Sequence, residues 1–134
     1  MKGQAAIEYM VIIGIALLIL TPILYYSGKS FSNYKEDTNI LSARNTVEKI
    51  GENADWICAQ GSPARVQINV HMPEDIIEAS LENRTVLLRI ESTSGAKEVF
   101  YESVCDLQGE LPVKEGFYYL ALVAVDNYVN ITVA

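Results

Sequence analysis

A single carboxylate, Glu8, stands at the entrance to a long apolar run in this chain of 134 residues. The next residues, from Tyr9 to Gly28, carry no charge. A lone carboxylate at the end of an apolar segment is costly unless a cation or the positive end of a helix neutralises it. The chemistry expected of Glu8 is therefore electrostatic pairing.

Two cysteines, Cys58 and Cys105, are the candidates for redox chemistry. If the part of the chain that contains them is exported, a disulfide between them is the natural interpretation, because thiols oxidise outside the cytoplasm. The alternative is two unpaired, small, apolar side chains. No Cys-x-x-Cys or His/Cys spacing favours a zinc site, and the sequence predicts no metal and no other cofactor.

Two Asn-x-Thr sequons offer sites for N-glycosylation, at Asn83 and Asn130. We expect Asn83 to lie at a turn and Asn130 to lie in the last strand. Sequons often stay unused, and the turn position makes Asn83 the better candidate.

The remaining polar residues give no catalytic signature. His71, the only histidine, falls on the polar side of an alternating segment, which favours a solvent-facing side chain over a metal ligand. Glu74, Asp75 and Glu78 follow Pro73 and could bind calcium, but a solvated acidic turn explains them as well. Phosphate loops, nucleophile elbows and paired catalytic carboxylates are all lacking in the sequence, so we predict no enzyme.

The apolar run has the length of a membrane-spanning helix. Twenty helical residues span about 30 Å, which is the thickness of a bilayer core. Tyr9 at one end and Tyr25 and Tyr26 at the other suit the two interfaces. Lys2 upstream favours a cytoplasmic N-terminus and export of the residues beyond the run. Pro22 predicts a kink or local melting within the helix.

Beyond residue 28 the pattern becomes amphipathic. One narrow stripe of apolar residues recurs at spacings of three and four, and the charged residues fall outside it. We expect residues 4–58 to form one long helix, with 4–28 as its apolar part and 29–58 as its amphipathic part. This face must be covered, most simply by the strands that follow. The stripe consists of Ile40, Ala43, Val47, Ile50, Ala54 and Ile57.

Residues 59–134 are predicted to form a β-rich head. Strict alternation from Val66 to Met72 indicates a half-buried strand, and residues 79–92 predict a hairpin that turns at Asn83. Further strands are expected at 97–105, 116–125 and 128–134, which makes about six. The expected class is α+β, a long helix followed by a small antiparallel sheet or sandwich.

The net charge of −7, with basic residues scattered singly, disfavours a nucleic-acid partner.

The first residues resemble a known processing signal. Gly3-Gln4-Ala5-Ala6-Ile7-Glu8-Tyr9, followed by an apolar helix, is similar to the class III signal peptide of archaeal type IV pilin-like proteins. Ala6 stands where the family usually has serine. An ordinary secretory signal is cut after its apolar stretch, whereas this motif lies before it.

The resemblance implies that a prepilin peptidase cleaves between Gly3 and Gln4, which removes residues 1–3 as a leader. The retained helix would anchor the subunit in the membrane during biogenesis and then bundle with copies of itself in a helical filament used for adhesion. Glu8 would pair with the α-amine of a neighbouring subunit, unless Gln4 cyclises and removes that amine. The alternatives are a minor pilin, or a surface-anchored β-domain that binds a ligand without polymerising. For Glu8 alone, the alternative role is neutralising the dipole of its own helix.

Overall fold

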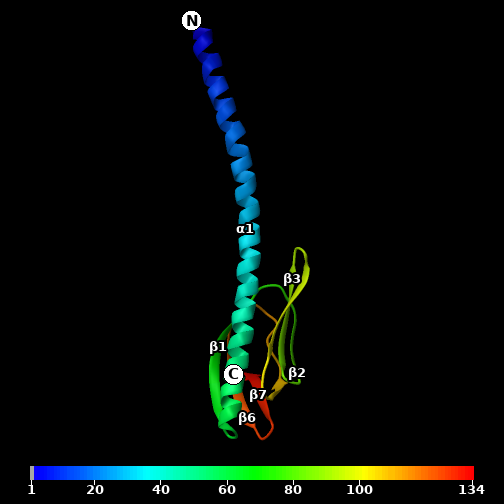
Figure 1. Ribbon diagram of the computed structural model, residues 1–134. Coiled ribbons are helices and arrows are strands. Elements are labelled where there is room, and N and C mark those ends of the chain that lie inside the picture. The colour runs from blue at the N-terminus through cyan, green and yellow to red at the C-terminus, as the bar shows by residue number, and fades with distance from the viewer. Residues whose placement is uncertain (1) are drawn as a thin grey trace. The chain divides into compact units, whose positions relative to one another are not determined.

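A computed structural model of the protein describes residues 2–134. The chain divides into two compact units, of which the first ends at Glu36 and the second comprises Asp37–Ala134. One helix is followed by seven strands, in the α+β arrangement predicted from the sequence (Figure 1). The elements are α1 (Lys2–Gln60), β1 (Arg65–Met72), β2 (Ile76–Glu82), β3 (Thr85–Ser92), β4 (Gly95–Glu102), β5 (Asp106–Gly109), β6 (Gly116–Val125) and β7 (Tyr128–Val133).

Helix α1 is slightly longer than the predicted range of 4–58 and is not interrupted at Pro22. Of the two expectations at Pro22, a kink or local melting, local melting is wrong. The helix continues because nearby leucine and alanine residues have high helix propensity, which offsets the one missing N–H. The hydroxyl of Thr21 donates to the Leu17 carbonyl over 2.7 Å within this segment.

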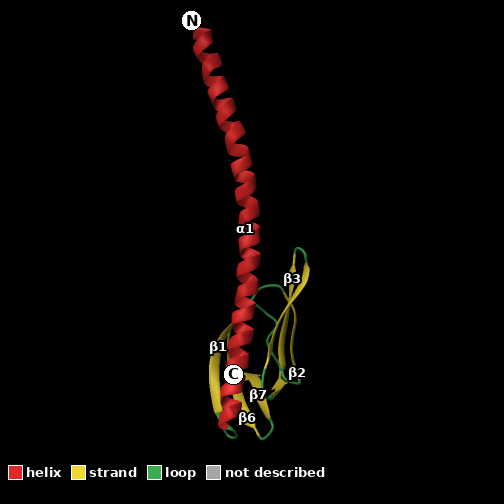
Figure 2. Cartoon of the chain, in the orientation of Figure 1, coloured by secondary structure: helices red, strands yellow, loops and turns green. Residues whose placement is uncertain are grey.

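The second unit contains two sheets (Figure 2). The larger has the strand order β1-β6-β7-β5, with β5 parallel to β7 and the other neighbours antiparallel. The smaller is the antiparallel sheet β2-β3-β4. Strand β5 was not predicted, because four residues are too few to show an alternating pattern. Gly109 closes it with φ of +124°, where a Cβ atom would lie 1.9 Å from the Ile131 carbonyl oxygen.

The amphipathic part of α1 packs against both sheets in one core. The predicted stripe is confirmed, since Ala43, Val47, Ile50, Ala54 and Ile57 are fully buried and Ile40 is partly buried against them. The alternation in β1 is also confirmed, since its apolar residues lie inside and Gln67, Asn69 and His71 lie outside. The strands contribute the largest remaining core side chains, namely Met72, Leu88, Ile90, Leu120, Leu122 and Ile131.

Side chains of α1 also protect the edge strand β1. The Thr46 hydroxyl donates to the His71 carbonyl over 2.6 Å, and the Lys49 ammonium donates to the Asn69 carbonyl. Carbonyl groups on an open edge invite pairing with another strand, so these two bonds reduce that hazard. They also fix the helix beside the outer residues of β1.

Candidate assembly and processing site

Gly3, Gln4 and Glu8, the residues of the N-terminal motif with expected roles in processing and assembly, lie on α1 in the first unit, and all are exposed. Gly3 and Gln4 lie at the start of α1 as the structure describes it. Glu8 lies one turn beyond Gln4 on the same face. Within residues 2–134 its exposed carboxylate forms no hydrogen bond or ion pair.

The apolar run after Glu8 is open on every side. One helix in residues 2–134 is long and apolar enough to span a bilayer, and none of its most apolar 18-residue window is buried. Its isoleucine and leucine side chains are between 47% and 75% exposed. Burying each such side chain is worth about 1.5–3 kcal/mol. By length and composition, the segment is compatible with a membrane anchor.

Tyrosines mark both ends of this run. Tyr9 lies directly after Glu8, and Tyr25 and Tyr26 lie in edge-to-face contact with their ring centroids 6.1 Å apart. All three rings are exposed. Tyrosine combines an apolar ring with a polar hydroxyl, which suits the boundary between an apolar layer and water.

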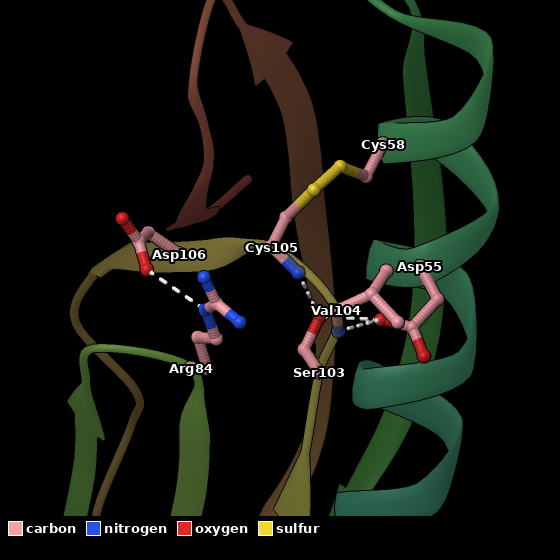
Figure 3. A network of polar contacts seen from close by, with 7 residues as sticks. All are labelled: Asp55, Cys58, Arg84, Ser103, Val104, Cys105 and Asp106. Atoms are coloured by element: carbon pink, nitrogen blue, oxygen red, sulfur yellow. Dashed lines mark hydrogen bonds and ion pairs between the residues drawn. A yellow bond between two sulfur atoms is a disulfide. The ribbon is translucent and has the colours of Figure 1, made fainter.

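In the second unit, the structure joins Cys58 near the end of α1 to Cys105 just before β5 (Figure 3). Their Cα atoms lie 6.5 Å apart, and the bond joins two residues that are 47 positions apart in the sequence. The two cysteines named from the sequence are thus brought together.

Beside this bridge, Asp55 accepts three hydrogen bonds. The backbone N–H of Val104 donates over 2.9 Å, the Ser103 hydroxyl donates to the same oxygen, and Tyr101 donates to the other oxygen over 2.8 Å. Figure 3 shows Ser103 and Val104 facing the helix at Asp55. Sequence reasoning missed this network, because Asp55 lies outside the apolar stripe and looked like a solvated residue.

The ring of Tyr101 crosses α1 where Gly51 leaves space. A Cβ atom on Gly51 would lie 2.0 Å from Cδ1 of this ring. The hydrogen bond to Asp55, together with burial and nearby carboxylates, raises the pKa of the Tyr101 phenol above its ordinary value. A glycine inside a helix, one turn before an aspartate, was the only sequence signal for this contact.

The two sequons occupy different settings. Asn83 is exposed in the turn between β2 and β3 with φ of +53°, and its carbonyl accepts a hydrogen bond from the Leu107 N–H. Asn130 is half-buried in β7, between Val123 of β6 and Gln108 of β5. Neither lies in the unit that holds Gly3, Gln4 and Glu8.

The weaker candidates also have defined neighbours. His71 is exposed on β1, with its ring 4.6 Å from that of Phe117 and Nδ1 3.1 Å from the Ser42 hydroxyl. Of the acidic residues after Pro73, Glu78 pairs with Arg89 over 2.9 Å. The backbone of Glu74 is held by the Asn39 amide. No group of three potential metal ligands occurs in the part of the chain that the structure describes.

Comparison with known proteins gave no matching family model, no matching curated protein and no matching solved structure.

Proposed function

We propose that this protein is a structural subunit of an archaeal type IV pilus-like surface filament, made as a membrane-anchored precursor. A prepilin peptidase would cut between Gly3 and Gln4 and leave the apolar helix on the mature chain. Copies of residues 4–28 would then form the filament core, and the β-rich head would lie outside, where it serves adhesion. The motif at Gly3, Gln4 and Glu8 supports this proposal.

The observation that carries most weight is the unpaired carboxylate at the start of an apolar helix that is exposed all round. A bundle of such helices buries the apolar side chains but leaves each Glu8 in need of a cation. The α-amine freed at Gln4 of a neighbouring subunit supplies one. Pairing it with Glu8 sets the axial register of the incoming subunit.

The same exposed helix also suits a plain membrane anchor for a surface binding domain, or a minor pilin that primes a filament. Electron microscopy of sheared surface appendages, followed by peptide identification, separates these functions. A major subunit is expected to dominate the filament fraction. A protein found only in the membrane fraction would contradict the filament proposal and favour the anchor.

Two measurements test the processing and assembly steps. Mass spectrometry of the native protein should find a mature chain that begins at Gln4, and retention of residues 1–3 would contradict cleavage. Glu8→Gln should abolish filaments while the protein still accumulates in the membrane. Glu48→Gln, which removes an exposed carboxylate from the same helix in the second unit, is the matched control and should assemble normally.

A further inference from the structure

The second unit contains an open groove between α1 and the outer side of strands β1 and β6. One wall comes from Leu41, Ser42, Asn45 and Lys49 of the helix, and the other from Asn69, His71 and Phe117. Its volume is about 510 Å³, within the range of small-ligand sites. The bonds from Thr46 and Lys49 to the β1 carbonyls hold the two walls together, so the groove is preformed.

An exposed aromatic surface borders this groove. Phe117 is 76% exposed, and its ring leans on that of His71 at an interplanar angle of 47°. Tyr119 comes next on the same face of β6 and lies opposite Asn69 in the strand register. Aromatic rings that face solvent in a row are costly and mark a surface that contacts something.

The polar groups of the groove are hydroxyls, the amides of Asn45 and Asn69, the imidazole of His71 and the ammonium of Lys49. The side-chain amides of Asn45 and Asn69 form no hydrogen bond within residues 2–134, so both are available to a ligand. Among these described residues no carboxylate lines the groove, although the chain has 17 acidic and 10 basic residues. The ammonium of Lys49 is held by the Asn69 carbonyl.

This composition excludes several classes of occupant. A metal ion would need carboxylate or paired imidazole ligands, and a nucleic acid would need more than one basic side chain. A protein partner needs a contiguous apolar centre, whereas the exposed apolar side chains that line the groove, Leu41 and Phe117, come from its two separate walls. A sugar ring fits both features, because its C–H face stacks on an aromatic ring and its hydroxyl groups bond to amides.

We propose that this groove binds a short, uncharged oligosaccharide, with Phe117 as the stacking surface and Asn45 and Asn69 as hydrogen-bonding groups. The inference concerns the second unit only and holds whether or not the chain forms filaments. If the head serves adhesion, the groove defines the chemical class of surface that it recognises.

The test uses the full chain in a zwitterionic detergent that has no sugar head group, because a maltoside would compete. Chitotriose, maltotriose and trigalacturonate serve as two neutral probes and one acidic probe, with dissociation constants from calorimetry and contacts from saturation-transfer NMR. At least one neutral probe should bind. Phe117→Ala and Asn45→Ala should each weaken that binding about three- to tenfold, the loss expected for one stacked ring or one hydrogen bond.

Phe100→Ala is the matched control, because Phe100 is also an exposed aromatic residue but lies on β4 of the other sheet. It should bind the neutral probe as the unsubstituted protein does. The proposal would be overturned if trigalacturonate alone bound or if none of the three probes bound. It would also be overturned if the Phe117→Ala and Asn45→Ala variants bound the neutral probe as tightly as the unsubstituted protein. The protein could instead self-associate in the absence of sugar. If Phe117→Ala abolished that self-association, the groove would be assigned to a second copy of the chain.

Discussion

Tyr101 occupies the space that the missing side chain of Gly51 leaves on α1, with its Cδ1 atom 2.0 Å from where a Cβ atom would lie. From there its hydroxyl reaches Asp55, one turn further along the helix, over 2.8 Å. A glycine, a tyrosine and an aspartate thus join the helix to β4. This contact lies beside the disulfide between Cys58 and Cys105.

Gly51→Ala should destabilise the second unit, because the new methyl group displaces the Tyr101 ring and its bond to Asp55. We expect a loss of about 1–3 kcal/mol in the free energy of unfolding, although alanine favours helix by about 1 kcal/mol over glycine. Urea unfolding followed by the fluorescence of Trp56 measures it. In a Tyr101→Ala background the same substitution should cost nothing, and an equal cost there would contradict the clash. Gly28→Ala, where a Cβ atom has no neighbour within 4 Å, is the control.

Asp55→Asn should weaken three hydrogen bonds at once, because the acceptor loses its charge and half its acceptor capacity. We expect a loss of about 1–3 kcal/mol in unfolding free energy. Asp106→Asn removes an exposed carboxylate that contacts Arg84 at 3.4 Å and should cost far less. Similar losses in both variants would show that Asp55 has no special role.

The Tyr101 contact should also depend on alkaline pH. Its folded pKa lies above the ordinary value of 10.0, since the protonated phenol donates to Asp55. The contribution to stability is therefore complete below about pH 10 and is lost as the pH rises through the higher folded pKa. Unfolding midpoints measured across this range should fall more steeply for the unsubstituted protein than for Tyr101→Phe. Phe100→Ala, which removes an exposed aromatic side chain without a hydroxyl from the same strand, is the control and should leave the slope unchanged.

The fold was largely predictable because its elements follow simple periods. The three–four spacing from Ile40 to Ile57 and the alternation in β1 each specify one buried face, and the structure buries both. The hairpin at Asn83 was predictable from its turn residue. Strand β5 was not, because its pairing with β7 is parallel and depends on a tertiary contact rather than on a local pattern.

The polar contacts of the head were less predictable for a related reason. Asp55 has the local surroundings of a surface residue, and only β4 and the segment after it provide its partners. The groove beside Phe117 likewise depends on bringing residues 41–49 next to residues 69–71 and 117. The N-terminal motif is contiguous in the sequence, and its assignment as a processing signal stays a prediction.

The disulfide should contribute to the stability of the second unit. The chain-entropy estimate for a closed loop of 47 residues is about 4 kcal/mol, which is an upper figure. Reductant should therefore lower the urea midpoint of the unsubstituted protein. The doubly substituted Cys58→Ser, Cys105→Ser protein should already have the lower midpoint and should not respond to reductant. An equal response in both proteins would assign the effect to something other than this bridge.

N-glycosylation, if the host performs it, should occur at Asn83 and not at Asn130. Asn83 is exposed in a turn whose backbone is held by the Leu107 N–H, whereas Asn130 is half-buried in a strand paired on both sides. Intact-mass measurement of protein made in the native host should show a glycan on the unsubstituted chain. The glycan should be absent from the Asn83→Gln variant and present on the Asn130→Gln variant. The opposite pattern would contradict the structural argument.

The state of Gln4 decides whether Glu8 can act in assembly as proposed. An N-terminal glutamine can cyclise with loss of ammonia, which removes the α-amine, and within residues 2–134 no other group pairs with the Glu8 carboxylate. We therefore expect subunits from filaments to carry an uncyclised Gln4, as intact-mass measurement would show. Gln4→Ala cannot cyclise and should assemble at least as well as the unsubstituted protein, while Glu8→Gln should fail in either background. Filaments built wholly from cyclised subunits would remove the amine from the mechanism. Glu8 would then be left with the positive end of its own helix dipole as its partner.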